Sequence, residues 1–591
     1  MSTGFQDCKC VLRDGHWFIS GDPHVLHRAM KIFLGASRTD GKIKIRATDE
    51  TARDILWFKS RYPMKVEPEV VLRVAAGRYT MSQRKRAAIL ADGYKPQPVK
   101  FADGEAPRPY QIIAADLVKA SGSLLLADGL GVGKTASAIT AIADPAMRPA
   151  LIVAPPALEL QWKSQLKRFL PELSVHAIDS TKPYALNVMK ACQCGEVVDS
   201  RLHTKWKRLQ CPKCGLSIYA GGSRPDVVLC SYTKLDNWAD HLAQFARMVV
   251  WEECHALRRS DSLKWRAAKT IANSVPVKMG LSGTPIYNYG GESWNVIECI
   301  APGFLGPKET FRETWCSGYA GQGKEPALAE PEAFGSYLRS HGVMLRRTAE
   351  EVGIKLDAHQ KITYPIQADA SAFNAVSGRA AELARIILDD AKRQRGDSMR
   401  ASGEFDTMMR QATALAKLPY VCDFVDLLLE QDIPVVLFAH HRQVYDVLST
   451  RMNRWRPAFY TGTESPLQKD AAVTRFRNCD TSLFVCALRS GEGLDGLQFR
   501  SCTNVFAELD WAPACLDQCC GRTYRDGQKH PVNSYFLVSD FGIDPIMSQV
   551  LGLKRDQSEG LLGNRSIGPV KKIDPTEALR ELAAKYLSGR R

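Results

Sequence analysis

The chain of 591 residues has no run of about eighteen apolar residues, so a transmembrane helix of ordinary length is excluded. Its first residues, 1–7, lack the charged and apolar regions of a secretory signal peptide. The 17 cysteines therefore indicate thiols and metal ligands rather than a disulfide framework. We expect a cytoplasmic protein, associated with the nucleoid if its source is prokaryotic or viral, and no membrane partner.

The chain also has fewer acidic than basic side chains. The chain has 79 lysines and arginines against 64 aspartates and glutamates, which gives a net charge of +15 and a pI near 9.0. This excess favours a polyanionic partner, although a basic soluble protein with no such partner is the alternative reading. The hydrophobic content of 45% is ordinary for globular protein, and the length predicts roughly three or four domains.

A glycine-rich loop follows the apolar run at residues 124–126 and ends in Gly133-Lys134-Thr135. Loop glycines let backbone N–H groups close around a polyphosphate, the lysine can reach the β- and γ-phosphates, and the threonine hydroxyl can ligate Mg²⁺. Asp128 stands where the strict pattern has glycine. A chance Gly-Lys-Thr in a strand–helix turn is the alternative, and the motifs farther along the chain weaken it.

Short apolar runs at intervals suited to βα units follow this loop, and a second set begins near residue 430. Continuous apolar strands separated by helical stretches predict parallel sheets that are covered on both faces. We therefore predict two α/β lobes, joined by a helical region with little strand character and a linker near residues 395–398. The predicted strands are 151–154, 227–230, 248–251 and 277–281, and then 435–438, 483–486, 504–506 and 535–538.

Polar clusters lie at the ends of these strands, where ligands of parallel sheets bind. Glu252 and Glu253 follow one strand; such a pair is more often a solvated turn, but it can also hold Mg²⁺ and orient an attacking water. Small hydroxyls lie in the segment 280–288. The second lobe contributes the segments 488–495 and 517–528, and the latter includes Arg522 and Arg525.

These ordered motifs resemble the SWI/SNF-type ATPases of helicase superfamily 2 over about residues 100–550. Pro107–Gln111 is similar to the motif that reads adenine, Ile152–Trp162 and Leu229–Lys234 to segments that touch a nucleic-acid backbone, and Met344–Thr348 to the arginine pair before the second lobe. Phe438–His441 and Phe506–Pro513 look most like the HARP-type annealing helicases, which act on forked DNA.

The resemblance implies ATP and Mg²⁺ as ligands and assigns roles to individual residues. Arginines supplied across the cleft by the second lobe would neutralise charge on the transferring phosphoryl group. The implied residues are Gln111 on the adenine; Asp128, Gly129, Gly131, Gly133, Lys134 and Thr135 on the phosphates and metal; Glu252 as the metal-side acid and Glu253 as the water-activating acid; Gly493 and Asp495 as nucleotide sensors; and Gln518, Arg522 and Arg525 as catalytic groups.

Two positions depart from the family pattern, which has aspartate at Glu252 and glutamate at Gly129. The extra methylene of Glu252 displaces a carboxylate from an octahedron that Mg²⁺ keeps strictly. We expect a working DNA-dependent ATPase that translocates on double-stranded or forked DNA, and anneals or reverses forks or displaces bound protein. A non-hydrolysing DNA clamp and an RNA-directed helicase of the same superfamily remain as alternatives.

Two cysteine knuckles interrupt the first lobe at Cys192-Gln-Cys194 and Cys211-Pro-Lys-Cys214. Four thiolates at such spacing predict a zinc ribbon with a structural Zn²⁺, and His203 is available as a substitute ligand. The basic cluster 205–208 between the knuckles can contact phosphates or form a solvated hairpin tip.

The expected fold is therefore α/β, with two tandem RecA-like parallel-sheet lobes, helical protrusions, the zinc ribbon and a small N-terminal α+β module. The HARP-type resemblance makes that module a candidate for recognising the DNA substrate, and we expect a monomer. The predicted domains are 1–100 as the accessory module, 101–300 as the first lobe with the insert 190–220, 301–430 as the helical protrusion and linker, 431–550 as the second lobe, and 551–591 as a basic tail with a final helix at 576–585.

Overall fold

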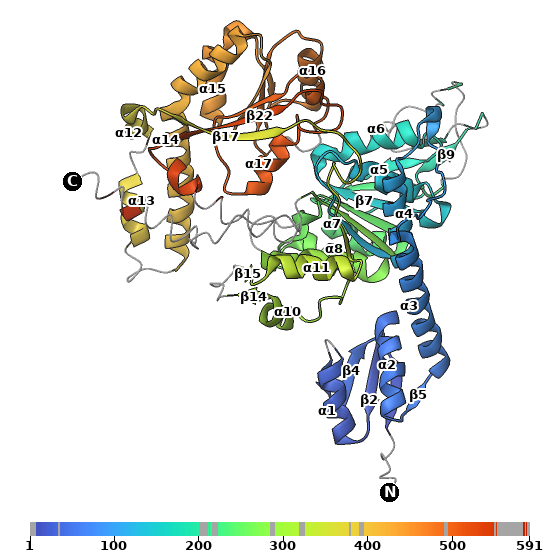
Figure 1. Ribbon diagram of the computed structural model, residues 1–591. Helices are drawn as coiled ribbons and strands as arrows, with labels where there is room; N and C mark the ends of the chain where they lie inside the picture. Colours follow the sequence, from blue (N-terminus) through green and yellow to red (C-terminus); the bar gives the residue numbers. More distant parts are fainter. Residues whose placement is uncertain are drawn as a thin grey trace.

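The computed structural model shows three bodies in chain order: a small N-terminal module, a first lobe and a second lobe (Figure 1). None of the helices in the part of the chain described is long and apolar enough to cross a membrane. The predicted helix 576–585 lies almost wholly outside the described residues. The structure describes residues 8–33, 36–192, 194–195, 197–199, 211, 213–214, 223–283, 290–317, 325–376, 380–388, 395–489, 494–548, 551, 583–584 and 587.

The N-terminal module is a five-stranded sheet with three helices. Alternation in His16-Trp-Phe-Ile-Ser20 directs Trp17 and Ile19 into the core that the sheet shares with the helices. Asp22 and Thr48 cap the first two helices with their side chains. The strand order is β3-β4-β2-β1-β5, with β1 Lys9–Arg13, β2 His16–Ser20, β3 Ser37–Thr39, β4 Lys42–Arg46 and β5 Lys65–Glu67; the helices are α1 Pro23–Ile32, α2 Asp49–Arg61 and α3 Glu69–Leu90.

The first lobe is built on a seven-stranded sheet in which every pairing is parallel. Its order is β16-β6-β13-β12-β7-β11-β8, with β6 Ser123–Leu126, β7 Ala150–Ala154, β8 Val175–Ala177, β11 Val227–Ser231, β12 Met248–Glu252, β13 Val277–Leu281 and β16 Met344–Leu345. Its helices are α4 Pro109–Ser121, α5 Lys134–Ile142, α6 Glu159–Phe169, α7 Leu235–Phe245, α8 Leu263–Ser274, α9 Ser293–Ile300, α10 Lys308–Trp315 and α11 Pro331–Ser340.

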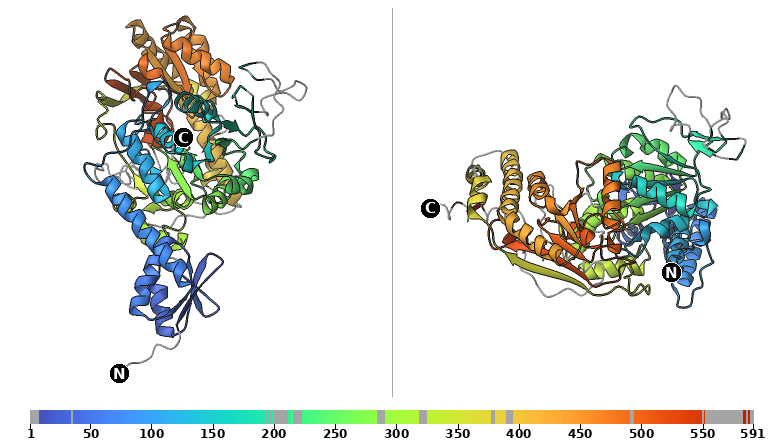
Figure 2. Two further views of the ribbon diagram at one scale, coloured as in Figure 1. Left: turned by 90° about the vertical axis from the view of Figure 1, so that its right-hand side faces the viewer. Right: turned by 90° about the horizontal axis from the view of Figure 1, so that it is seen from above.

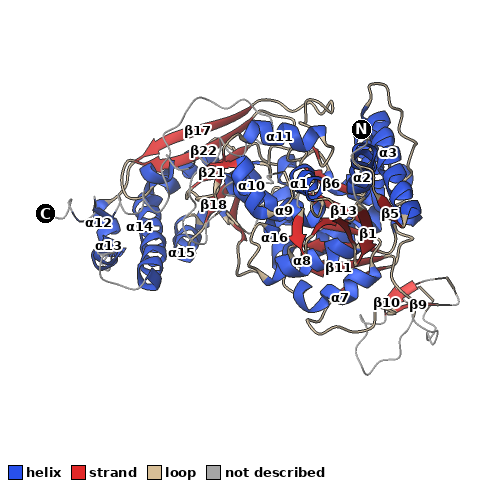
Figure 3. Ribbon diagram, turned by 90° about the horizontal axis from the view of Figure 1, so that it is seen from below, coloured by secondary structure: helices blue, strands red, loops and turns tan. Residues whose placement is uncertain are grey.

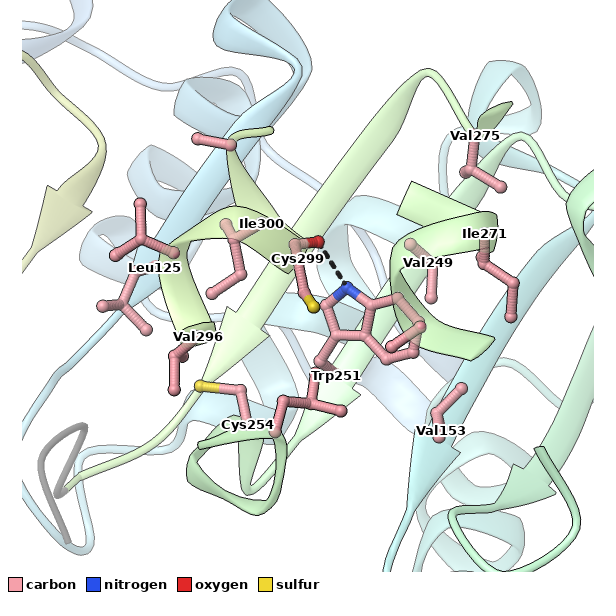
Figure 4. Close-up of a cluster of buried hydrophobic side chains, with 14 of the residues drawn as sticks. Leu125, Val153, Val249, Trp251, Cys254, Ile271, Val275, Val296, Cys299 and Ile300 are labelled. Atoms are coloured by element: carbon pink, nitrogen blue, oxygen red, sulfur yellow. Dashed lines mark hydrogen bonds between the residues drawn. The ribbon is translucent and has the colours of Figure 1, made fainter. Parts of the chain in front are cut away.

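Hydrophobic clusters cover both faces of this sheet, as its continuous apolar strands predict. On one face Trp251 is fully buried and donates its indole N–H to the carbonyl of Cys299, 3.2 Å away (Figure 4). Two small hairpins complete the lobe, and the first projects from its edge on the side away from the second lobe (Figure 3). They are β9 Met189–Ala191 with β10 Val197–Asp199, and β14 Cys316–Ser317 with β15 Ala327–Leu328.

The second lobe repeats this architecture with six parallel strands. The order is β17-β22-β21-β18-β20-β19, with β17 His359–Ile366, β18 Val435–Ala439, β19 Ala458–Tyr460, β20 Leu483–Ala487, β21 Thr503–Phe506 and β22 Val532–Ser539. Its helices are α12 Ala370–Val376, α13 Ala380–Leu388, α14 Arg395–Glu430, α15 Arg442–Arg451, α16 Pro466–Arg477 and α17 Pro513–Cys520. The predicted α/β class with two parallel-sheet lobes is confirmed.

The region between the lobes departs from the sequence prediction in two respects. Residues 344–345 and 359–366 are strands, one in each sheet, where little strand character was expected. The second of these, β17, lies at the sheet edge and carries mostly exposed side chains and Pro365, so it has no apolar signature. The linker predicted at 395–398 is wrong, because Arg395 begins the 36-residue helix α14.

Candidate active site

A cleft with a volume of about 140 Å³ lies where the first lobe meets α17 of the second. The carboxyl ends of β6 and β12 supply one wall, and α17 with the turn after it supplies the other. Seven predicted catalytic or metal-binding residues line this cleft together with Gly131 and Gly133: Lys134, Thr135, Glu252, Glu253, Gln518, Arg522 and Arg525.

The glycine loop between β6 and α5 contacts both lobes closely. Gly131 and Gly133 have φ angles of +78° and +91°, which side-chain-bearing residues rarely adopt. A Cβ on Gly131 would lie 2.7 Å from the Cβ of Arg525, and one on Gly133 would lie 2.5 Å from Nε2 of Gln111. The loop is therefore a backbone cradle in which glycine is required at both positions.

Lys134 begins α5 and folds over this loop. Its ammonium group donates to the carbonyl oxygens of Asp128, at 3.0 Å, and Gly129, at 3.2 Å. Burial lowers the pKa of Lys134, and the nearby charge of Glu253 opposes that shift. A half-buried cation at the start of a helix is suited to an anionic ligand.

Asp128 does not turn its carboxylate toward the cleft. The side chain is fully buried and forms a two-pronged ion pair with Arg347, at 3.1 Å to Nε and 2.5 Å to an Nη atom. Arg347 also donates to the carbonyl of Tyr110, and the hydroxyl of Tyr110 donates to the carbonyl of Val132. Asp128 thus joins the glycine loop to α4 and to the segment after β16, and only its backbone lies in the cradle.

Gln111, on the first turn of α4, is buried beside the loop. Its side-chain carbonyl accepts the backbone N–H of Arg108 at 2.9 Å, and its Nε2 lies 3.5 Å from the carbonyl oxygen of Gly133. The contact places the predicted adenine-reading residue next to the cradle. Gln111 is not among the residues that line the cleft.

The acidic pair follows β12. Glu253 has a φ of +47°, an unusual conformation for a non-glycine residue and one associated with functional sites. Burial would raise the pKa of Glu253, but the hydrogen bond and charge of His255 and the charges of Lys134 and Arg522 hold it below its ordinary value. His255 lies 3.3 Å from the Glu253 carboxylate and 3.2 Å from the hydroxyl of Ser282, in the predicted segment 280–288. Residues 284–289 lie outside the described part of the chain.

Opposite this acidic pair, the second lobe supplies side-chain nitrogen atoms. Nε2 of Gln518 and Nε of Arg522 are buried, and no partner for either is found among the described residues. Arg525 donates to Asp495 at 3.0 Å, and burial lowers the pKa of Arg525. Buried donors without acceptors cost free energy, so an oxygen-rich anion such as a polyphosphate fits this wall. The predicted sensor Gly493 lies outside the described residues.

Three residues of the segment that resembles a nucleic-acid contact also lie on the cleft wall. Leu158, Gln161 and Trp162 come from the turn before α6 and from its first turn. Their spacing of three and four residues places them on one helix face. That spacing, directly after a buried strand, is the signal in the sequence that could have identified them.

The four predicted zinc ligands converge beside the first hairpin of the first lobe. The sulfur atoms of Cys192 and Cys214 are 3.5 Å apart, those of Cys194 and Cys211 are 3.6 Å apart, and all four lie within 4.8 Å of one another. Next to them His176 of β8 hydrogen-bonds to Asp199 of β10 at 2.5 Å, which fastens the hairpin to the sheet edge. The basic cluster 205–208 lies outside the described residues.

The family model for the SNF2-related domain matches residues 53–400, more than half of the chain. The bovine (Bos taurus) protein named DNA annealing helicase and endonuclease ZRANB3 is 23% identical over 463 residues, which cover 76% of this chain and 40% of that protein.

Two further relatives give similar figures. The Xenopus tropicalis SWI/SNF-related matrix-associated actin-dependent regulator of chromatin subfamily A-like protein 1 is 25% identical, over 71% of this chain and 41% of that protein. The DNA repair and recombination protein RAD54-like of Drosophila yakuba is 22% identical, over 74% of this chain and 60% of that protein. The chain spans about two fifths of the length of the first two of these relatives.

Among solved structures, the Sulfolobus solfataricus SWI2/SNF2 ATPase core in complex with dsDNA is 17% identical. The match covers 84% of this chain and 98% of that chain, with a TM-score of 0.35. The structure of the Sulfolobus solfataricus SWI2/SNF2 ATPase core domain gives a TM-score of 0.34 at 18% identity, over 81% of this chain and 94% of that chain.

Proposed function

The chain belongs to the SNF2-related family of ATPases, and on that premise we propose that it is an ATP-driven translocase on double-stranded or forked DNA. It remodels branched DNA by annealing or fork reversal, or displaces bound protein. The observation that carries this proposal is the cleft, in which Lys134 and Glu253 of one lobe face Arg522 of the other.

The glycine cradle and Lys134 bind the phosphates of ATP. Backbone N–H groups at the start of α5 and the ammonium group supply donors and positive charge, and Gln111 contacts the base beyond the cradle. Thr135 and Glu252 would hold Mg²⁺, which neutralises phosphate charge when bound. The cleft places both residues on its wall.

Glu253 accepts a proton from the attacking water, because its depressed pKa keeps the carboxylate ionised. Gln518 orients that water, while Arg522 and Arg525 stabilise charge on the transferring group. Asp495, which pairs with Arg525, links this step to the second lobe. Closure of the lobes completes the site, and their reopening moves them along the DNA backbone.

The net charge of +15 suits a polyanionic track, and residues 152–162 and 229–234 contact its backbone. We keep the domain limits 1–100, 101–300, 301–430, 431–550 and 551–591 as proposals, with recognition of the DNA substrate assigned to the first.

The four converging cysteines hold a structural Zn²⁺. A tetrahedral site with Zn–S bonds of about 2.3 Å places its sulfur atoms about 3.8 Å apart, and the 3.5 and 3.6 Å separations of Cys192–Cys214 and Cys194–Cys211 approach that value. Purified full-length protein should contain one zinc per chain by elemental analysis, and Cys211→Ser should lose it while Cys316→Ser keeps it. Two disulfides per chain in thiol titration, with no zinc, would refute this assignment.

The function is tested by steady-state ATP hydrolysis with no nucleic acid, duplex DNA, forked DNA, single-stranded DNA or RNA. We expect strong stimulation by duplex and forked DNA that is lost in Lys134→Ala. Stimulation by RNA instead would favour an RNA-directed helicase. Flat hydrolysis with intact DNA binding would mean that Glu252 has disabled the motor and that the protein is a clamp. Strand annealing and displacement of a bound protein, measured on forked DNA, then separate the two remodelling activities.

A further inference from the structure

The sheet of the N-terminal module has two unlike faces. Inward side chains such as Trp17, Ile19 and Ile43 pack against α1, α2 and α3 in one hydrophobic cluster. The alternate residues point to the other side, which no helix of the module covers, and together we call them the open face. The open face consists of Lys9, Val11, Arg13, His16, Phe18, Ser20, Ser37, Thr39, Lys42, Lys44, Arg46, Lys65 and Glu67.

An aromatic side chain lies at the centre of the open face. Phe18 of β2 is directly opposite Val11 of β1 on one side and Lys44 of β4 on the other. It is partly exposed, whereas its neighbours in sequence, Trp17 and Ile19, are buried. The His16 ring lies beside it, with 6.5 Å between the ring centroids.

The open face is strongly basic. Lysine or arginine stands at positions 9, 13, 42, 44, 46 and 65, against the single acid Glu67, which already pairs with Lys65 at 2.7 Å. Arg46 donates to Asn273 of the first lobe at 3.1 Å. The other four cations, Lys9, Arg13, Lys42 and Lys44, form no ion pair with any residue that the structure describes. This surface therefore attracts a polyanion.

We infer that the open face binds single-stranded DNA, with a base stacked on Phe18 and the flanking phosphates held by Lys42 and Lys44. This inference rests on the proposed action on DNA and specifies that the module binds single-stranded rather than duplex DNA. A flat sheet with an accessible aromatic ring favours an unpaired base, since bases within a duplex are stacked on one another and offer no face to Phe18.

The module is fastened to the motor, so a strand bound there has a defined position. The helix α3 runs from the module to the first lobe (Figures 1 and 2). Arg86 of α3 donates to the carbonyls of Ser340 and His341 at the end of α11. With the Arg46–Asn273 contact, these bonds hold the open face outside the nucleotide cleft, where it can grip one unpaired arm of a branched substrate.

The stacking contact is tested with Phe18→Leu, which keeps an apolar side chain but removes the aromatic face, and Phe18→Tyr, which keeps both. Binding of the full chain to a fluorescent oligothymidylate and to a blunt duplex is measured by anisotropy. A stack contributes about 1–3 kcal/mol, so we expect Phe18→Leu to weaken single-strand binding roughly tenfold. Phe18→Tyr should keep the affinity of the parent chain, and duplex binding should change less than about twofold in both.

The phosphate contacts are tested with the double variant Lys42→Ala/Lys44→Ala. For single strands, the slope of log K against log salt is about −0.7 for each phosphate contact, so this variant should make the slope less negative by about 1.4. The matched control is Arg28→Ala/Lys31→Ala, which removes two exposed cations from α1 on the covered side and should leave the slope unchanged.

Two results would overturn the inference: equal single-strand affinity in Phe18→Leu and the parent chain, or equal losses on duplex and single strand. Melting temperatures of the variants are compared with that of the parent chain to show that the module is folded. Failure of the proposed function is a separate observation, because it appears as absent DNA-stimulated hydrolysis in the parent chain itself.

Discussion

In the first lobe, two charged side chains at the cleft are held by partners within that lobe. The carboxylate of Asp128 is paired with Arg347, and Lys134 donates to two carbonyl oxygens of its own loop. In the second lobe, Gln518 and Arg522 each bring to the same cleft a buried nitrogen with no acceptor among the described residues. Bonds within the lobe hold these two side chains of the first wall, whereas the second wall has spare donors.

This difference separates stability from catalysis. A paired, buried group contributes mainly to the free energy of folding. When it is removed, the charge of its partner stays buried with neither a counter-charge nor water around it. A buried donor that has no acceptor within the protein gains one when a ligand binds. Its removal should therefore lower chiefly the rate of ATP hydrolysis. Substitutions on the two walls should therefore have opposite signatures.

The largest effect is expected from Arg522→Ala. If this guanidinium stabilises charge on the transferring phosphoryl group, its removal should lower DNA-stimulated kcat by about 10³-fold or more. Its Nε has no partner to lose, and its Nη1 gives up a hydrogen bond to the carbonyl of Leu494, 3.2 Å away, so the free energy of unfolding in urea should fall by only about 1 kcal/mol.

The control for that change is Arg451→Ala, an exposed arginine at the end of α15 in the same lobe. It should leave both kcat and unfolding unchanged. A large loss of stability in Arg522→Ala, with kcat per folded molecule unaltered, would show that the comparison between the two walls is mistaken.

The next largest effect is expected from Asp128→Ala in the first lobe. Removing one partner of a buried ion pair costs about 3–5 kcal/mol, here because Arg347 keeps a charge that has no carboxylate. Urea unfolding measures the loss, and the exposed Asp240→Ala on α7 is the control, with an expected change within about 0.5 kcal/mol. In a double-mutant cycle with Arg347→Ala, the combined loss should be smaller than the sum, and strict additivity would contradict the pairing.

Much of the fold follows from local patterns in the sequence. Buried parallel strands such as 248–252 are continuous apolar runs, and the glycine loop and the arginines after α17 stand in short motifs. These features can be predicted because each depends on residues that are close together in the sequence.

Other features depend on contacts between distant segments. The Asp128–Arg347 pair joins residues 219 positions apart, and no local pattern reports it. The strand β17 is polar because it lies at a sheet edge. Its residues form a strand through their pairing with β22, which an apolar pattern in the sequence does not report. The glycine, aspartate and serine at residues 396–398 favour loops in isolation but here occupy the first turn of a long helix.

The smallest effect concerns that edge strand, which has eight residues in the second lobe, whereas the edge strand β16 of the first lobe has two. His359 of β17 stacks on Tyr524, with 4.7 Å between centroids, and its Nε2 lies 3.0 Å from the Ser534 hydroxyl. Burial, with the charge of Lys361, lowers the pKa of His359 from 6.5 to about 4. Between these values the unfolded chain binds a proton that the folded chain does not, so stability falls as pH drops from 6.5 towards 4.

His359→Gln should remove this proton-linked loss. Between pH 7 and pH 5 the variant should lose about 1 kcal/mol less unfolding free energy than the parent chain, a modest amount because the ring is partly exposed to solvent. Urea unfolding at the two pH values measures the difference, and His530→Gln, an exposed histidine of the same lobe, should follow the parent chain. Identical losses in His359→Gln and the parent would mean that His359 titrates normally, and that the long edge strand of the second lobe is no more sensitive to acid than the short one of the first.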